Sequence, residues 1–325
     1  MLYVNDHVPA HFGDKRYYSW NTYLRNEFGG KVIKVPIDGG FDCPNRDGSI
    51  AIGGCTFCSK RGSGDYAGDR RDTVLDQFHS VKNRLSYKWP DARYMAYFQA
   101  YTNTYAPVSE LRAMFEPVLK EEGVVGIAIG TRPDCLPDDV VDYLADLNMR
   151  TFLWVELGLQ SAHDVTGERI NRAHDFQTYK EGVHKLRSRG IRVCAHIING
   201  LPGESREMMI ETAEAAADLG VEGIKIHLLH VLKQTTMAKE LERGEFGLLD
   251  RDTYTEIVLR QLERLPEEMV IHRLTGDGPR DLLIGPEWSL KKWEVLNGID
   301  HGLKDGDTWQ GKYAPHSVSS GGERS

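Results

Sequence analysis

Short runs of apolar and β-branched residues alternate along the chain with stretches whose apolar residues recur every three or four positions. The first pattern predicts buried strands and the second predicts amphipathic helices. The helical stripes are Leu111/Phe115/Val118, Val140/Leu144/Leu147, Phe176/Tyr179/Val183/Leu186 with Gly190 as its end, and Met209/Ala213/Ala216/Leu219. The predicted strands are Val32–Ile37, Tyr94–Gln99, Val124–Gly130, Thr151–Gly158, Ile191–Ile198 and Gly223–Leu229, with Met269–Leu274 as a less regular seventh.

Strand and helix alternate in units of roughly thirty residues, which predicts an α/β fold with a parallel sheet, either doubly wound or closed into a barrel. In both folds ligands bind beyond the carboxyl ends of the strands. The 325 residues are enough for one large core. We divide the chain into an N-terminal segment (1–31), a core (32–265), a C-terminal extension (266–315) and a flexible tail (316–325).

Polar residues gather where the predicted strands end. Taken singly, each is more often a hydrogen-bonded core or loop residue, but together at one edge of a sheet they predict a site. These residues are Gln99, Thr131, Arg132, Asp134, Glu156, Gln160, His196, Asn199, His227, His230 and Lys233.

Three cysteines, Cys43, Cys55 and Cys58, lie in the loop after the first predicted strand. The turn-forming residues among them predict a loop that can fold around a bulky group. A closed zinc or iron–sulfur site takes four protein ligands, so three thiols leave one metal position open to another molecule. Two alternatives remain: three buried thiols that only pack, or a zinc site completed by a distant histidine such as His79.

Net charge narrows the range of partners. A net charge of −8 argues against binding of nucleic acid through the overall charge of the protein, although a local basic patch is compatible with this charge. No apolar run reaches the ~18 residues that a membrane span needs, and the N-terminus lacks the apolar core of a signal peptide. Five cysteines, an odd number, do not suggest a disulfide framework. We therefore expect a cytoplasmic protein whose thiols are available to bind metal.

The chain resembles the radical S-adenosylmethionine (SAM) superfamily in an ordered series of stretches that includes CPNRDGSIAIGGCTFC, YFQAYTNTYAP, GTRPDCLP, WVELGLQS, HIINGLPGE and IKIHLLHVLKQ. It is most similar to the YtqA/YhcC-type group, which is similar to the catalytic subunit of Elongator, and the eleven residues between Cys43 and Cys55 agree with that branch. The resemblance implies a partial (β/α)6-type parallel barrel with a short C-terminal extension. It also implies a [4Fe–4S] cluster held by Cys43, Cys55 and Cys58, with SAM on the open iron. There SAM would be cleaved reductively to methionine and a 5′-deoxyadenosyl radical.

The resemblance assigns further roles. Phe57 would pack against the adenine of SAM, Gln99 lies where the superfamily contacts the amino group, and Arg172 is a candidate for the carboxylate. Cys135 is a candidate fourth ligand or hydrogen donor, whereas Cys194 is expected to be buried. The other SAM-binding candidates are Glu156, Gln160, Gly200, Gly203 and Glu204, and the other catalytic candidates are His196, His227, His230 and Lys233.

The implied substrate is the wobble uridine of tRNA, with 5-carboxymethylaminomethyluridine converted to 5-aminomethyluridine. A flavodoxin or ferredoxin would supply the electron. Two alternatives are radical chemistry on a protein or small molecule, and a non-catalytic iron–sulfur or zinc protein. The residues available for tRNA are the basic Lys15, Arg16, Arg25, Lys31, Lys34, Lys291 and Lys292, and the aromatic Tyr17, Tyr18 and Trp20.

Overall fold

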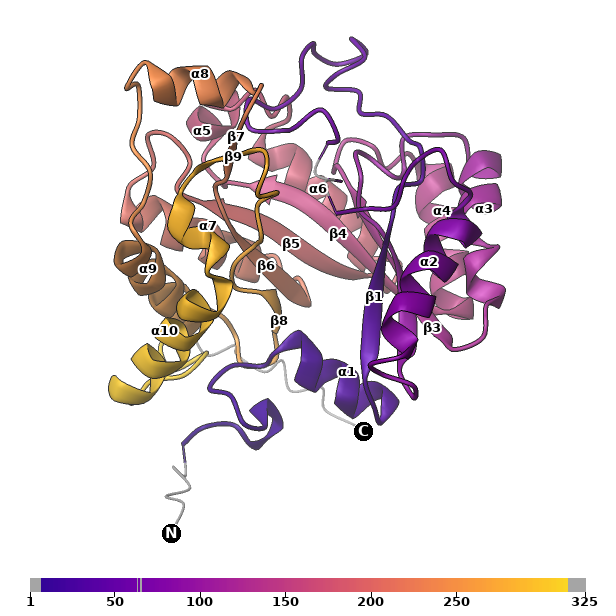
Figure 1. Ribbon diagram of the computed structural model, residues 1–325, viewed down its shortest axis with the longest axis horizontal. Helices are drawn as coiled ribbons and strands as arrows, with labels where there is room; N and C mark the ends of the chain where they lie inside the picture. Colours follow the sequence, from indigo (N-terminus) through magenta and orange to yellow (C-terminus); the bar gives the residue numbers. More distant parts are fainter. Residues whose placement is uncertain (1–6, 63, 65, 315–325) are drawn as a thin grey trace, which may run out of the picture.

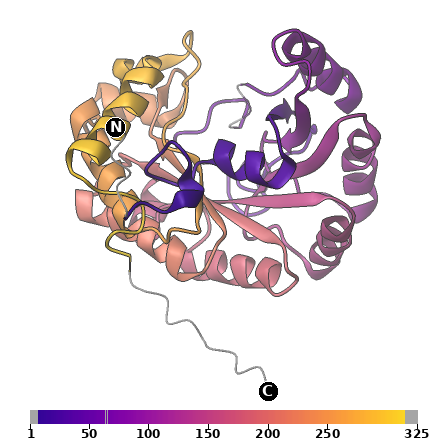
Figure 2. The ribbon, with the colours of Figure 1, turned by 90° about the horizontal axis from the view of Figure 1, so that it is seen from below.

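The computed structural model describes residues 7–314 except residues 63 and 65, so the predicted tail lies outside the described residues. In the described part, seven parallel strands form one sheet in the order β1-β2-β3-β4-β5-β6-β8. Figures 1 and 2 show this sheet curled into a partial barrel whose edge strands are β1 and β8. The strands are β1 (Val32–Ile37), β2 (Arg93–Phe98), β3 (Val124–Thr131), β4 (Phe152–Gln160), β5 (Arg192–Asn199), β6 (Gly223–Leu228) and β8 (Val270–Arg273).

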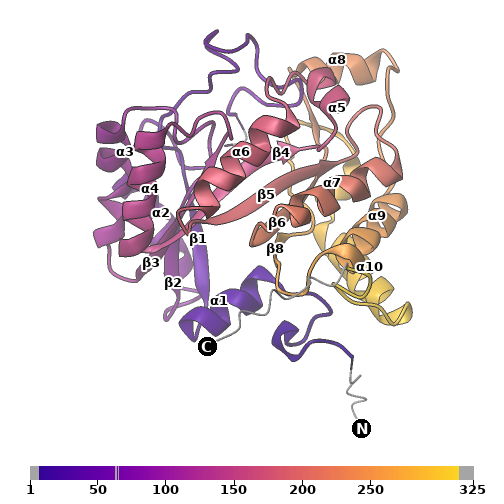
Figure 3. The same cartoon turned by 180° about the vertical axis from the view of Figure 1, so that it is seen from behind.

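Helices cover the convex face of the sheet: α4 contacts β4, and Figure 3 shows α6 and α7 lying across the outside of β5. The helices are α1 (Trp20–Phe28), α2 (Val74–Ser86), α3 (Val108–Phe115), α4 (Asp138–Arg150), α5 (Asp164–Arg169), α6 (Phe176–Arg187), α7 (Arg206–Asp218), α8 (Thr236–Glu242), α9 (Arg251–Arg264) and α10 (Lys292–Asp305). Three 3-10 helices, Ala10–Phe12, Val118–Lys120 and Glu287–Leu290, and the antiparallel pair β7 (Val231–Leu232) and β9 (Leu283–Gly285) complete the described elements.

The seven predicted strands and the partial barrel are confirmed. The strands of this sheet follow one another in chain order, with only β7 of the separate pair between β6 and β8, so the doubly wound alternative is wrong. The seventh strand, β8, comes from the range predicted as a C-terminal extension and pairs with β6. One predicted stripe divides in two: α3 ends at Phe115 and Val118 begins a 3-10 helix. The reason is Pro117, which has no N–H to continue the helical hydrogen bonds.

The alternation of side chains along each strand separates an apolar outside from a polar inside. In β6, Ile224 and Ile226 point outward into the main core beneath the helices. Lys225 and His227 alternate with these isoleucines along the strand, so they point to the barrel interior and line its cavity. The sheet therefore buries its outer face against helices and offers its inner face to a ligand.

Helix α1 covers the amino end of the barrel, where Figure 2 shows it crossing below the strands. It packs against both edge strands, β1 and β8. Its Leu24 joins an apolar cluster that includes the fully buried Trp154 of β4, and Trp20 and Tyr23 pack against this cluster. Because aromatic side chains fill this end, ligands are expected to approach from the carboxyl ends of the strands.

The outer core gives a first prediction. Leu144→Ala in α4 removes a side chain with 0% exposure, and we expect the free energy of unfolding to fall by about 2–5 kcal/mol. The matched control is Met149→Ala in the same helix, 81% exposed, for which a change within about 0.5 kcal/mol is expected. Urea denaturation of both variants measures the difference, and equal losses would contradict the assigned burial.

Candidate active site

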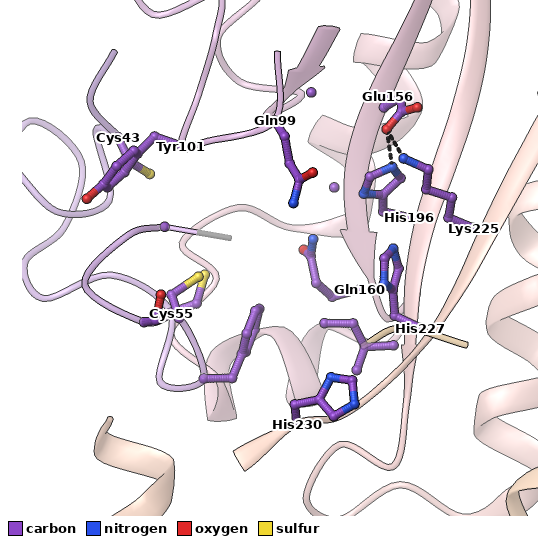
Figure 4. A pocket seen from close by; sticks show the side chains of 18 of the residues that line it. Cys43, Cys55, Gln99, Tyr101, Glu156, Gln160, His196, Lys225, His227 and His230 are labelled. Atoms are coloured by element: carbon purple, nitrogen blue, oxygen red, sulfur yellow. Dashed lines mark hydrogen bonds and ion pairs between the residues drawn. The ribbon is translucent and has the colours of Figure 1, made fainter. Parts of the chain in front are cut away.

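One cavity lies at the carboxyl ends of the strands, and we call it the thiol cavity because Cys43, Cys55 and Cys58 all line it. Figure 4 shows the cysteines on one side, Gln99 and Gln160 between, and a group of histidines with Glu156 and Lys225 on the other. Many residues predicted to form a site are thus brought together. Those that line the cavity are Cys43, Cys55, Phe57, Cys58, Gln99, Thr131, Arg132, Glu156, Gln160, His196, His227 and His230.

The cysteine loop joins β1 to α2 and is held by backbone hydrogen bonds. The carbonyl of Cys43 accepts from the N–H of Arg46 at 2.8 Å, which closes a turn directly after the first thiol. The side chain of Asn45 donates to the carbonyl of Asn171 at 2.7 Å, and its Nδ2 lies 3.5 Å from Sγ of Cys55. These bonds fix the loop to the segment after α5, so the thiols have a defined place above the barrel.

The thiols differ in acidity. A hydrogen bond from Cys58 lowers the pKa of Cys55 to about 7, and the nearby charge of Arg132 contributes. The same hydrogen bond, together with burial, raises the pKa of Cys58 well above its usual value. Cys55 therefore ionises before Cys58, and the thiolate is the form that binds metal.

The arrangement of the thiols bears on which metal group they fit. Among the described residues, no three His, Cys, Asp or Glu side chains lie close enough together to bind a single ion. Zinc needs ligands that converge on one point, whereas in an iron–sulfur cluster each thiolate binds a different iron. His79 lies on α2, where its Nε2 is 3.2 Å from a carboxylate oxygen of Glu121, and it does not line the thiol cavity. The three partly exposed thiols share one cavity, and a [4Fe–4S] cluster takes one thiolate on each of three irons, so their number and common placement suit a cluster.

Glu156 of β4 lies at the floor of the cavity with no exposure of its side chain. Its Oε1 accepts from Nζ of Lys34 at 2.5 Å, and its Oε2 lies 2.9 Å from Nε2 of His196. Lys225 donates to the same Oε2 and also to the hydroxyl of Tyr97 at 2.9 Å. Four strands, β1, β4, β5 and β6, thus meet at one carboxylate.

Burial and neighbouring charges shift the pKa values of Glu156 and Lys225 in opposite directions. Burial alone would raise the pKa of Glu156, but the charges of Lys225 and Lys34 hold it well below its usual value, so the carboxylate is ionised. Burial lowers the pKa of Lys225 to about 7 despite the attraction of Glu156. Burial also lowers the pKa of His196 to about 4, so this ring is neutral near pH 7.

Aromatic rings surround the lysine on β1. The Nζ of Lys34 lies 4.5 Å from the ring centroid of Trp20 and 4.9 Å from that of Tyr97, within cation–π range. The ring of His272 packs against Trp20 with centroids 3.9 Å apart. The prediction that Lys34 belongs to a tRNA-facing surface is therefore wrong, because its position on β1 directs it into the barrel. Trp20 packs against His272 and Lys34 in the same place, so it does not belong to the predicted tRNA-facing surface either.

Arg172 does not line the thiol cavity. Its buried guanidinium donates to the carbonyl oxygens of Leu159 at 2.7 Å, Ser161 at 2.5 Å and His174 at 2.8 Å. These donors hold the backbone after β4, and the contact of Arg172 with the SAM carboxylate stays a prediction.

Several other predicted residues also lie away from the cavity. Cys135 is buried and lines a second cavity that shares no lining residue with the first. Lys233 is exposed and donates to the carbonyl of Asp281 at 2.7 Å. The side chain of Glu204 accepts from the hydroxyl of Ser161. Gly200 and Gly203 have φ angles of 90° and 87°, which supports a turn after β5 but does not bring them to the cavity lining.

Three important lining residues escaped the sequence analysis: Tyr97, Lys225 and Arg273. Tyr97 and Lys225 lie inside strands, whereas most of the residues predicted to form the site lie at or after the ends of strands. A signal was present for Lys225, because a lysine flanked by Ile224 and Ile226 in a period-two pattern must face a different environment from its neighbours.

Residues 45–216 match the Radical SAM superfamily, and residues 221–305 match the Radical_SAM C-terminal domain. The chain belongs to the radical SAM superfamily. It is 61% identical to YtqA of Bacillus subtilis (strain 168) over 95% of this chain and 96% of that protein. It is 40% identical to YhcC of Escherichia coli (strain K12) over 87% of this chain and 90% of that protein.

The radical SAM fold is also found in the solved structure of the archaeal Methanocaldococcus infernus Elp3 with an N-terminal deletion. The match covers 83% of this chain and 64% of the Elp3 chain, with a TM-score of 0.61 and 16% sequence identity. It shows a shared fold. Radical SAM enzymes bind a [4Fe–4S] cluster and SAM, and the three thiols in one cavity fit this cofactor pair. Within the described residues, no helix is both long and apolar enough to cross a membrane.

The buried network of this radical SAM barrel gives a second prediction. Glu156→Gln leaves Lys34 and Lys225 without their shared counter-charge, and we expect a loss of about 3–5 kcal/mol in the free energy of unfolding. The control is Glu256→Gln, which breaks an exposed pair with Arg206 and should cost about 0–1 kcal/mol. Chemical denaturation at pH 7 measures both variants, and a Glu156→Gln protein as stable as the control would show that the network is not a structural element.

Proposed function

We propose that this radical SAM enzyme modifies the wobble uridine of tRNA, converting 5-carboxymethylaminomethyluridine to 5-aminomethyluridine. The observation that carries the proposal is one cavity with thiols at one end and lysine, arginine and histidine side chains at the other, which suits a substrate with a small anionic group. A more distant relative gives further support. The tRNA uridine(34) acetyltransferase of Methanocaldococcus infernus is 24% identical over 49% of this chain and 30% of that protein.

Within this proposal Cys43, Cys55 and Cys58 hold the cluster, and Phe57, Gln99 and Gln160 surround SAM. When bound, this cofactor pair supplies a reductively generated 5′-deoxyadenosyl radical that removes hydrogen from an unactivated carbon. An electron donor of the flavodoxin or ferredoxin class is the partner that this chemistry needs. The chain itself contributes binding, orientation and exclusion of water.

The lining residues suit these tasks. Phe57 packs against the apolar cluster around Leu229 and Met237, so its ring has a fixed place beside the thiols. Gln160 has a φ of 62° at an irregularity between β4 and β5, and this turns its amide into the cavity. The hydroxyl of Tyr101 donates to the carbonyl of Lys60, which ties the loop after β2 to the cysteine loop. Together these contacts support a preorganised pocket.

A wobble uridine is already single-stranded, so it can enter the barrel mouth without the cost of opening a duplex. The distribution of charge limits how the rest of the tRNA is held. Of the predicted basic residues, Lys15 pairs with Asp300 and Arg16 with Asp307. Contacts with the tRNA backbone are therefore expected to be few, and the base and its side chain are expected to carry the selectivity.

The cluster assignment is tested by cysteine variants. Cys43→Ala, Cys55→Ala and Cys58→Ala should each lose the [4Fe–4S] cluster, because each removes the ligand of one iron. Cys194→Ala is the control, since this thiol is fully buried in β5 and does not line the cavity. Iron, sulfide and visible absorption after anaerobic reconstitution are the measurements. A full cluster in any of the first three variants would remove that residue from the ligand set, and zinc in place of iron and sulfide would favour the zinc alternative.

The substrate assignment is tested by incubating the reconstituted enzyme with SAM, a reductant and bulk tRNA. We expect 5-carboxymethylaminomethyluridine to fall, 5-aminomethyluridine to rise and 5′-deoxyadenosine to form, all measured by mass spectrometry of digested nucleosides. If the nucleoside is untouched while an added peptide or metabolite raises 5′-deoxyadenosine formation, the tRNA substrate is wrong and another radical SAM substrate is right. Absence of 5′-deoxyadenosine under every condition would favour the non-catalytic alternative.

A further inference from the structure

The end of the thiol cavity opposite the cysteines is rich in basic side chains. We call it the basic end and define it by Lys225, His227, His230 and Arg273, which come from β6, the turn after it, and β8. In Figure 4 the labelled histidines and Lys225 lie across the cavity from Cys43 and Cys55. A substrate between the two ends would have one part near the thiols and another part against these cations.

The carboxylates nearby already have partners. Glu156 is shared by two lysines, Lys34 and Lys225, so this group carries one excess positive charge when both lysines are protonated. Asp277, the other acidic residue of the lining, is 2.9 Å from Nζ of Lys292. Among the described residues, no carboxylate lies within ion-pair distance of Arg273. The basic end therefore has positive charge that the chain itself does not neutralise.

Two imidazole nitrogens in this region also have no partner. In the described part of the chain, Nε2 of His227 and Nε2 of His230 are buried and make no hydrogen bond. Buried polar atoms are normally bonded, so these two nitrogens beside the cavity are available to a ligand that enters it. Burial lowers the pKa of His230 to about 4 and holds that of His227 well below its usual value, so both rings are neutral and each keeps one N–H.

We propose that the basic end binds a carboxylate of the substrate, with Arg273 and Lys225 as its charge partners and His227 as a hydrogen-bonding neighbour. The planar fork of an arginine matches two carboxylate oxygens, and a buried lysine adds a point charge. This inference rests on the proposed function, in which the uridine side chain ends in a carboxymethyl group. Anchoring that carboxylate at the basic end leaves the adjacent carbon nearer to the cofactor end of the cavity. The site would thus select nucleosides by their acidic side chain.

The test measures binding without turnover. Anticodon stem-loop RNAs carrying the acid-bearing nucleoside, its neutral carboxamide analogue or plain uridine are titrated with reconstituted enzyme and SAM in the absence of reductant. We expect the acid-bearing RNA to bind about ten to a hundred times more tightly than the other two, as for a charge-assisted hydrogen bond. Arg273→Ala should remove this difference, and Arg273→Lys should keep part of it.

Arg280→Ala is the control, because this arginine is exposed, as Arg273 is, and near in sequence, but it does not line the cavity. Iron content and melting temperature of all variants confirm that the fold and cluster are intact. If Arg273→Ala weakens all three RNAs equally, the arginine binds an RNA phosphate and the proposal is overturned. If wild-type enzyme does not prefer the acid, the proposal is also overturned.

The binding result is independent of the proposed reaction. Preference for the acid that is lost in Arg273→Ala, without any loss of the nucleoside on turnover, would support the carboxylate site and reject the proposed reaction. In the opposite case, the enzyme converts the nucleoside, and Arg273→Ala prefers the acid-bearing RNA as strongly as the wild type does. That result would support the proposed reaction and reject the carboxylate site.

Discussion

The arrangement of this barrel depends on a carboxylate that cannot reach water. Glu156 is buried on the inner face of β4, and a charge in that place is tolerated only when it is paired and hydrogen-bonded. Lys34, Lys225 and His196 meet that need from three other strands, and His272 of β8 lies close by. The contacts of Glu156 with Lys34 and Lys225 link β4 to β1 and β6, two strands that backbone hydrogen bonds do not join to it.

The interior of the barrel is layered as a consequence. Aromatic residues under α1 fill the amino end, the charged network forms the next layer, and the thiol cavity lies above it. The apolar layer below lowers the local dielectric, which strengthens each ion pair of the network. The charged network closes the thiol cavity from below, so it also restricts how deeply a substrate can enter. This fits radical chemistry, in which the reacting carbon must be held near the cofactor and away from water.

The two segments of family similarity contribute different ends of the cavity. The segment 45–216 includes Cys55, Cys58 and Gln160, which line the cofactor end. The segment 221–305 includes Lys225, His227 and Arg273, which line the basic end. The two also touch outside the cavity, since the N–H of Met237 in α8 donates to the carbonyl of Thr56 between two cysteines at 3.0 Å. The two ends of the cavity thus come from different segments of the chain, and this backbone hydrogen bond joins the second segment to the cysteine loop.

The sequence by itself determined the strands, their parallel direction and the cysteine loop, because apolar runs, turn residues and thiol spacing are local signals, whereas the order of the strands in the sheet was settled by the structure. It also located the polar residues Gln99, Gln160 and His196 at one edge of the sheet. Only the tertiary structure decided that Arg172 holds backbone carbonyls and that Lys34 faces inward. Those roles depend on which side chains meet across a curled sheet, at separations such as the 122 positions between Lys34 and Glu156. No local pattern encodes such a meeting, since it arises only when the strands between the two residues bend the sheet.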